Sequence, residues 1–472
     1  GTTQLRIAAS TIDGDLTLTS GNASGIIDDG TVTVGRNLAA TTNANNGVIN
    51  LDTLAVTGSI ALATHGNGDA TVVNATGIEF AASDVNRNLS ATATTGTITQ
   101  SGALDIEGTT TLVTAAQGQA IVLGTATNAF TGAVTITTND NSSPGPVDGT
   151  YAAHVTIDGG TTQLRIAAST IDGDLTLRSG NASGIIDDGT VTVAGDLAAT
   201  TDASNGVINL GELAVTGSIA LVTHNTGAAT VVNATGIEFA ASTVGGALSA
   251  TATNGHITQT GALDITGVTT IVAGTSKNIT LTTATNDFKN DVLITSGNDV
   301  RLVDANAIDL GTSTVSGIYI VTATAGGGIT DSGVLTITGA STFTAAGGQS
   351  ILLTEDSTFA AVTFVTSGGG NLASVTINDS NAFELQALTL AGNLTVTAGD
   401  DITDDGTITV AGDLAATTDA SDGVITLNQL AVAGSIALNT HGTGAATVVN
   451  DHATGIEFAA STVGGALSAT AT

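Results

Sequence analysis

The stretch GDLTLTSGNASGIIDDGTVTV, residues 14–34, decides the fold of this chain. Apolar and polar residues alternate in three short runs, LTL, GII and VTV, and Gly, Asn and Asp stand between the runs. Period-two alternation with Val, Ile and Thr predicts β-strands, and Gly, Asn and Asp predict the turns between them. Three short strands in about 22 residues are what one coil of a parallel β-solenoid contains, with successive coils about 4.8 Å apart.

The same pattern recurs at nearly constant spacing. In the first part of the chain its leading apolar residues follow at steps of 22, 22, 29, 23 and 22 residues: Leu16, Leu38, Ile60, Leu89, Leu112 and Val134. We therefore predict an all-β fold, a right-handed parallel β-helix (β-solenoid) with about 22 residues and three short strands per coil. A string of immunoglobulin-like sandwiches would also alternate, but the short spacing and the absence of Trp disfavour it.

Longer repeats are superimposed on this short one. Residues 1–30 recur at 160–189 with a single change, Thr19 against Arg178. The phrase GVINLDTLAVTGSIALATHG also occurs three times, in slightly altered forms, at 47–66, 206–225 and 423–442. Near-literal copying of this kind is typical of repeat proteins.

These repeats predict three modules within one continuous solenoid. The second module is longer than the first, and the third stops part-way through the pattern, so we expect the chain to be a window on a longer protein. The predicted modules are 1–159, then 160–376 with extra coils at about 297–376, then 377–472 as a truncated module.

The composition excludes several classes of protein. The 472 residues contain no Cys, which excludes disulfide frameworks, zinc–thiolate sites, iron–sulfur clusters and thiol nucleophiles. Eight Lys and Arg against 41 Asp and Glu, a net charge of −33, argue against binding to nucleic acid. With 41% apolar and 10% charged residues the chain is expected to fold. No apolar run approaches the roughly 18–20 residues of a membrane span, so we expect no membrane insertion.

Three histidines occupy one repeated position, in the phrase THG or THN. His65, His224 and His441 are separated by 159 and 217 residues, which is about seven coils or more. At about 4.8 Å per coil they lie too far apart to share a metal ion within the chain. We interpret them as turn residues whose recurrence reflects module copying.

Acidic doublets followed by Gly are the candidate metal ligands. Carboxylates at a tight turn can bind Ca²⁺, although the chain has neither the nonapeptide of calcium β-rolls nor an EF-hand loop. Ordinary turn chemistry is the alternative, and we favour it because Asp caps turns through its short side chain. Calcium is the only cofactor considered, and its candidate ligands are Asp28, Asp29, Asp187, Asp188, Asp404 and Asp405.

Parallel β-helices also include polysaccharide lyases and hydrolases, which raises the question of an enzyme. Their chemistry needs two carboxylates about 5–9.5 Å apart, or a carboxylate beside Lys or Arg. Adjacent Asp residues of a strand point to opposite faces, and the few basic residues are scattered, with none after Arg301. We therefore predict no catalytic residue and no enzymatic activity.

Two further features have structural interpretations. Phe80, Phe239 and Phe458 recur in the phrase GIEFAAS and are predicted to fill the core. The segment 139–151, NDNSSPGPVDGTY, contains both prolines of the chain and is predicted to form a loop outside the coils. Loops on rigid scaffolds often carry function, so this loop is the expected contact surface.

The phrases GDLTLTSG, GALDITG, TNDFKNDVLITSGNDVRLVDANAIDLGTSTVSG and GGGITDSGVLTITG resemble β-strand-repeat modules of giant bacterial secreted proteins of the filamentous haemagglutinin and large-adhesin type. The resemblance covers essentially the whole chain, and residues 286–317 are its most telling part. It implies a right-handed β-helical shaft, export to the extracellular space or bacterial cell surface, and a role in attachment or in building a fibre.

The expected partners follow from that resemblance and from the charge. They are copies of the chain itself, packed laterally or end to end, or a ligand on a host or cell surface. The favoured function is a rigid structural segment of a giant surface protein. The alternatives are a self-assembling extracellular filament or sheath subunit and, third, a β-helical carbohydrate-active enzyme.

Overall fold

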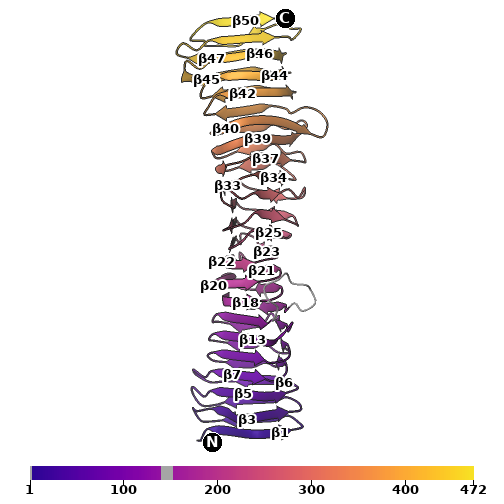
Figure 1. The fold of residues 1–472 in the computed structure, drawn as a ribbon, viewed down its shortest axis with the longest axis vertical. Coiled ribbons are helices and arrows are strands. Elements are labelled where there is room, and N and C mark those ends of the chain that lie inside the picture. The colour runs from indigo at the N-terminus through magenta and orange to yellow at the C-terminus, as the bar shows by residue number, and fades with distance from the viewer. Residues whose placement is uncertain (1–2, 140–152) are drawn as a thin grey trace. The chain divides into compact units, whose positions relative to one another are not determined.

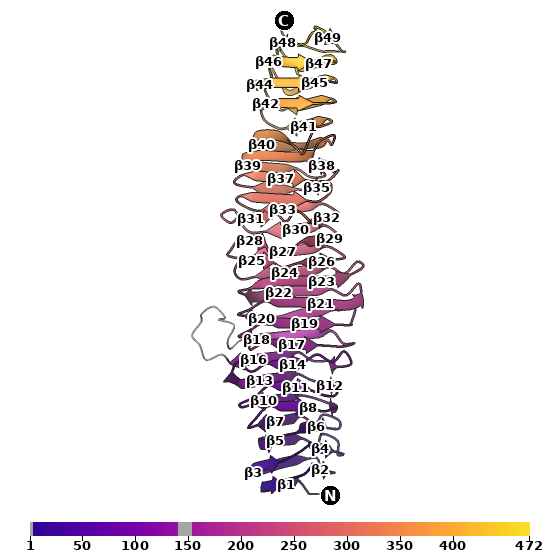
Figure 2. The same cartoon turned by 90° about the vertical axis from the view of Figure 1, so that its right-hand side faces the viewer.

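The computed structural model describes residues 3–139 and 153–472, and in this part of the chain all regular structure is β-strand. Within the described residues no helix is long and apolar enough to cross a membrane. The chain divides into two compact units, Gly1–Gly246 and Ala247–Thr472. Each unit is a stack of parallel strands, which appear as successive rungs in Figure 1 and Figure 2.

The first unit begins with coils that contribute to two sheets. Neighbouring coils keep the short repeat in register, because Leu16 pairs with Leu38 and Leu38 pairs with Ile60. The prediction of a parallel β-solenoid with coils of about 22 residues is thereby confirmed. One sheet contains β1 (Leu5–Ile12), β3 (Ile26–Val34), β5 (Ile49–Val56) and β7 (Ala70–Asn74), and the other contains β2 (Leu16–Ser20), β4 (Leu38–Thr42) and β6 (Ser59–Ala63).

The three segments predicted for each coil are present, but their boundaries vary. In the first coils the GII and VTV segments are joined into one strand, β3, whose pairing with β5 shifts register between Ile27 and Val32. Gly30 lies inside this irregular stretch with φ of 140°, a conformation that favours glycine. In later coils the segments are separate strands, namely β7, β8 (Ile78–Phe80) and β9 (Ser83–Val85), followed in the next coil by β10 (Leu89–Ala93), β11 (Ile98–Gln100) and β12 (Leu104–Ile106).

Inward-facing apolar side chains of successive coils form the core. Side chains such as Leu38 and Ile60 are at most 1% exposed, because the coils above and below cover them. Burial of one such side chain stabilises the stack by about 1.5–3 kcal/mol. Phe80 and Phe239 are fully buried as predicted, whereas Phe458 is 41% exposed in the last coil, over which no further coil lies. The prediction is therefore wrong for Phe458 in this structure.

The second unit repeats the architecture and contains the two longest strands of the described residues, of 12 and 17 residues. Aromatic rings fill part of its core, since Tyr319 and Phe343 meet edge to face at 6.0 Å and Phe343 meets Phe359 at 6.1 Å. Its strands include β27 (Leu248–Ala252), β30 (Thr269–Val272), β32 (Asp287–Phe288), β33 (Val292–Ser296), β34 (Val300–Asp304), β35 (Ile308–Leu310), β37 (Tyr319–Ala323), β38 (Ile329–Asp331), β39 (Leu335–Ala346) and β40 (Ile351–Ser367). Beyond them lie two sheets, β41 (Val375–Asp379), β43 (Leu394–Ala398), β45 (Leu414–Ser421) and β47 (Ser435–His441), and β42 (Phe383–Leu390), β44 (Ile402–Val410), β46 (Ile425–Val432), β48 (Ala446–Asn450) and β50 (Leu467–Ala471).

Close contact between coils predicts the effect of one glycine substitution. Gly184 has φ of 65°, and a Cβ atom there would overlap the carbonyl oxygen of Val207 in the next coil. That oxygen accepts the hydrogen bond of the Ile185 amide at 2.9 Å. We expect Gly184→Ala to lower the free energy of unfolding by about 2 kcal/mol or more, measured as the urea midpoint by circular dichroism.

Gly211→Ala is the matched control. The nearest atom to a Cβ at Gly211 lies 4.0 Å away, and Asp52 occupies the corresponding position of the first copy. The control should leave the midpoint within about 0.5 kcal/mol of the original. Equal midpoints for the two variants would contradict the proposed contact between coils.

Candidate functional site

Buried Asn or Asp side chains hold the same place at the end of several strands, Asn450 of β48 among them. Two other Asn and two Asp, all at most 1% exposed, concern us here: Asn74, Asn233, Asp304 and Asp379. They end β7, β24 (Ala229–Asn233), β34 and β41. Buried polar groups of this kind need partners, and the structure supplies them from the backbone. We call these four residues the plugs.

The Asn plugs both accept and donate. The Oδ1 atom of Asn233 accepts a hydrogen bond from the amide of Val215 at 2.8 Å. Its Nδ2 atom donates to the carbonyl oxygens of Val215 at 3.0 Å and Gly236 at 2.6 Å. One side chain therefore joins the preceding coil to the turn that follows its own strand. Asn74 makes the same three contacts with Val56 and Gly77.

The Asp plugs only accept, and their turns present donors instead. The Oδ2 atom of Asp304 accepts from the amide of Phe288 at 2.7 Å, and its Oδ1 atom accepts from the amide of Asn306 at 2.6 Å. The Oδ1 atom of Asp379 accepts from both corresponding amides, of Asn381 at 3.1 Å and of Phe359 at 3.4 Å. The turn after each plug thus matches the chemistry of the plug.

An outward-facing acid stands five residues after each plug. Glu79 lies in β8, Asp309 in β35 and Glu384 in β42, each one residue from the buried side chains on either side. In the next coil the residue in register is a threonine in all three cases: Thr99, Thr330 and Thr403. A groove runs beside each acid, with a volume of about 400 Å³ at Glu79, about 320 Å³ at Asp309 and about 40 Å³ at Glu384. We call these the acid grooves.

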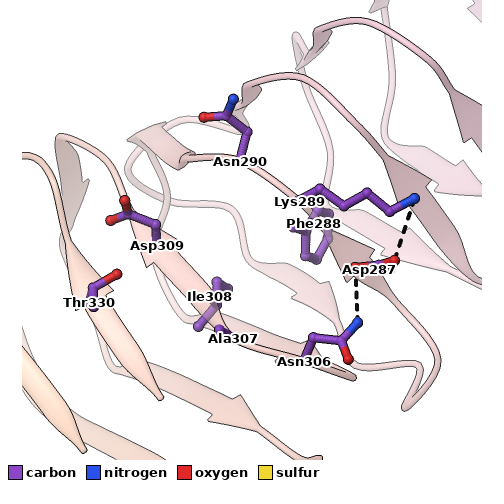
Figure 3. Close-up of a pocket in the computed structure, with 9 residues that line it drawn as sticks. All are labelled: Asp287, Phe288, Lys289, Asn290, Asn306, Ala307, Ile308, Asp309 and Thr330. Carbon is purple, nitrogen blue, oxygen red and sulfur yellow. Dashed lines mark hydrogen bonds and ion pairs between the residues drawn. The ribbon is translucent and has the colours of Figure 1, made fainter. Parts of the chain in front are cut away.

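The acid groove at Asp309 has two polar ends, as Figure 3 shows. At one end the Asp309 side chain lies beside Thr330 on the neighbouring strand. At the other end the Lys289 ammonium contacts Asp287 at 3.5 Å, and Asn306 donates to Asp287 at 3.1 Å. The walls come from β32 and its turn and from β35.

Of the charged groups in this groove, Lys289 has acidic partners and one oxygen of Asp309 has no partner within the described residues. Lys289 also contacts Asp264 at 2.5 Å, and this hydrogen bond is the main reason that the pKa of Lys289 is raised. The Oδ1 atom of Asp309, in contrast, is buried and has no hydrogen-bond partner within the described residues. An unpaired carboxylate oxygen at a groove can accept a hydrogen bond from a ligand or water.

The acidic doublets do not lie at turns as predicted. They lie inside the joined strands β3, β20 (Ile185–Val193) and β44, where Gly allows the strand to kink. The first carboxylate of each doublet accepts hydrogen bonds from two backbone amides of the next coil. Its partners are Asp52 and Thr53 for Asp28, Gly211 and Glu212 for Asp187, and Asn428 and Gln429 for Asp404, all at 2.7–3.1 Å.

The second carboxylate of the doublet has a different role. Asp29 forms an ion pair with Arg6, and Asp188 forms one with Arg165 at 2.7 Å. Asp405 is in register with Gln386. Among residues 3–139 and 153–472 no three His, Asp or Glu side chains form a group that could hold a metal ion. Calcium binding at the doublets stays a prediction.

Two of the recurring histidines, His224 and His441, end strands, whereas His65 lies two residues after the end of β6. His224 ends β23 (Ser218–His224) and places its Nδ1 atom 2.8 Å from the carbonyl oxygen of Thr201. His441 makes the equivalent contact with Thr418 at 2.7 Å, and the carbonyl oxygen of His65 accepts from Asn46 at 2.8 Å. The predicted contact loop at 139–151 lies, from residue 140 on, outside the described residues.

A family model described as Repeats of unknown function (DUF5649) matches residues 67–137, 226–295, 297–366 and 372–439. The third match falls in the extra coils predicted at about 297–376. The plugs Asn74, Asn233, Asp304 and Asp379 are each the eighth residue of a matched copy, and the acids Glu79, Glu238, Asp309 and Glu384 are each the thirteenth. No curated protein and no solved structure matches the chain.

Sequence reasoning missed both the plugs and the acid grooves. The phrases ATVVN and GIEF recur in the chain, and they contain a plug and an acid. The repeated phrase GIEFAAS predicts a core role for its aromatic residue, Phe80, but Glu79 recurs beside it in the same phrase. In a later copy ATVVN becomes VRLVD and GIEF becomes AIDL. The polar last residue and the acid are kept in these altered phrases, and this is the signal that could have identified the plugs and the acids.

The plug chemistry predicts a sharp difference between two Asn→Asp changes. Asn233→Asp puts a carboxylate oxygen against the carbonyls of Val215 and Gly236, so we expect the urea midpoint to fall by the equivalent of about 2 kcal/mol or more at neutral pH. Asn205→Asp is the control, because only Oδ1 of Asn205 accepts a hydrogen bond, from Thr226. Asp422 makes that contact in the third module. Equal effects of the two changes would contradict the assigned donor role of Nδ2.

The Asp plugs predict a pH dependence of the second unit. Burial raises the pKa of Asp304 and of Asp379, and it does the same for Asp331, which accepts from the amide of Thr354. Each carboxyl therefore binds its proton more tightly in the folded unit than in the unfolded chain. The free energy of unfolding should rise as pH falls from neutral through these raised pKa values, and the gain is complete below the ordinary value of 3.8.

Carbon-13 NMR titration of the carboxyl groups checks this expectation. The Asp304 carboxyl should titrate above the ordinary value of 3.8. Asp413 is the internal control, because hydrogen bonds from Ser435 lower its pKa and it should titrate below that value. An Asp304 titration at or below that of Asp413 would contradict the assignment.

Proposed function

The chain belongs to the family described as Repeats of unknown function, and from this membership and the stacked coils we propose that it is a structural segment of a giant secreted bacterial surface protein. In this proposal the segment acts as a rigid shaft or fibre at the cell surface or outside the cell, without enzymatic activity. Its partners are copies of itself or a ligand on another cell surface.

The observation that carries the proposal is the near-literal copying of whole coils. The copied segments fold into equivalent strands, β1 to β3 from Leu5 on and β18 (Leu164–Ile171) to β20 from Leu164 on. The copies also repeat their ion pairs, since Arg6 pairs with Asp29 and Arg165 with Asp188. Such duplication adds coils, and about 4.8 Å per coil, without adding a new active site. Length is the property that it changes.

The surface charge is consistent with a saline setting. The net charge is −33, and few cations are present to neutralise it. Uniform negative charge keeps neighbouring shafts apart at low salt, whereas an ionic strength of about 0.15 M screens the repulsion beyond about 8 Å. A secreted shaft meets that ionic strength in many extracellular media.

Electron cryo-microscopy of the native material, with antibody labelling of intact cells, tests the proposal. We expect label on the outside of cells and single solenoids, one coil wide, that end in other domains. Solenoids packed in a regular lattice would replace the shaft with the filament or sheath alternative. Label only after permeabilisation would overturn the surface location.

A further inference from the structure

We propose that the acid grooves at Glu79 and Asp309 bind neutral saccharides, with these two acids as the carboxylates that accept hydrogen bonds from sugar hydroxyls. The groove at Glu384, about 40 Å³, is too small for a sugar ring. This proposal goes beyond the shaft function and is independent of it. A shaft that binds no sugar is still a shaft, and a sugar-binding solenoid need not be one.

Recurrence of the acid in diverged copies is the first step. The copies that begin at 67 and 226 share the phrase GIEF, whereas the later two have AIDL and AFEL. The neighbouring residues change and the acid stays. The chain has only 7 Glu, and four of them occupy the middle of IEF or FEL: Glu79, Glu238, Glu384 and Glu457.

The acid is not required by the fold. Within the described residues the Glu79 side chain takes part in no hydrogen bond or ion pair and Oδ1 of Asp309 is without a partner, whereas Glu384 accepts a long hydrogen bond of 3.4 Å from Gln386. The doublet acids, in contrast, hold the backbone of the next coil. A strand position that faces outward accepts almost any polar residue, so retention of an unpaired acid points to a ligand.

The surroundings of the acid suit hydroxyl groups. Glu79 lies in register between Ser59 and Thr99, so a carboxylate and two hydroxyls form a row with spacings of about 4.8 Å. Asp309 has Thr330 on one side and the Asn290 amide across the groove. A carboxylate accepts hydrogen bonds from adjacent hydroxyl groups, and Thr and Asn side chains both donate and accept hydrogen bonds. Together these side chains complement the two hydroxyl groups of a diol.

The groove is also shaped and held for a small ligand. The volumes of about 400 Å³ at Glu79 and about 320 Å³ at Asp309 lie in the range of small-molecule sites. Gly77 and Ala307 stand at the equivalent place of the two grooves, where a larger side chain would occupy part of the space. A plug bonds to lining residues of each of these two grooves, Asn74 to Gly77, and Asp304 to Phe288 and Asn306.

Charge decides which saccharides fit. The acids and the net charge of −33 repel sulfated and uronic sugars. The one cation of the Asp309 groove, Lys289, is engaged by Asp264 and Asp287. Neutral sugars carry the donors that the acids lack and meet no such repulsion.

Saturation-transfer difference NMR with the complete 472-residue chain tests the proposal. The neutral probes are lactose, mannotriose and triacetylchitotriose, and the anionic probe is a heparin-derived tetrasaccharide. The test variant combines Glu79→Gln, Asp309→Asn and Glu238→Gln, because Glu238 occupies the position of Glu79 in the second copy of GIEF and lies in register with Ser218 as Glu79 does with Ser59. The matched control combines Asp84→Asn, Asp105→Asn and Asp356→Asn, which change exposed strand acids outside the grooves.

We expect transfer to at least one neutral probe, with affinity about tenfold weaker in the test variant and unchanged in the control. Urea unfolding should show that both variants fold like the original chain. Absence of transfer to all three neutral probes overturns the proposal. Equal affinity in the test variant, or binding of the tetrasaccharide as tight as that of the neutral probes, overturns it as well.

Discussion

Backbone hydrogen bonding between successive coils, in parallel and in register, is the constraint on which the rest of the structure depends. Leu16, Leu38 and Ile60 lie one above another only because each coil returns the chain to the same position about 22 residues later. Because side chains alternate between faces, a slip of one residue would turn the whole inward row outward. The regular spacing of the sequence is thus a condition of folding, and coils of other lengths must restore the register by a bulge or a turn.

Side chains with amide or carboxylate groups hold successive coils in register at places where the backbone hydrogen bonds between coils are interrupted. The plugs bond to the backbone of one coil and to the turn of another, and the first Asp of each doublet bonds to the bulged strand of the next coil. Asn and Asp are chosen by the partner that the turn presents, a carbonyl after Asn233 and an amide after Asp304. The chain's preference for Asp and Asn follows from this short reach to the backbone.

Much of the fold could be predicted from the sequence, because period-two alternation and coil spacing are direct consequences of strand geometry. The joining of two segments into one strand could not be predicted, because GIIDDGTVTV contains the sequence DDG, which is typical of a turn. Only the three-dimensional ladder reveals that Gly30 kinks a continuing strand and that Asp28 reaches the next coil. The same limit applies to the plugs, whose partners are 18 residues away in the sequence for Asn74 and Val56. Handedness of the coils stays a prediction from general rules.

The differences between copies distinguish residues that are kept for stability from residues that are kept for another reason. Where a plug changes from Asn to Asp, its turn changes with it, so the pair is maintained by stability. Where Glu79 is replaced by Asp309, no partner inside the described chain changes, because no described residue pairs with the Glu79 carboxylate or with Oδ1 of Asp309. Literal copying explains the acid in the two GIEF copies, but it does not explain its survival in AIDL and AFEL, where most neighbouring positions have been substituted. A requirement outside the chain accounts for that survival, and the groove beside the acid is where such a requirement acts.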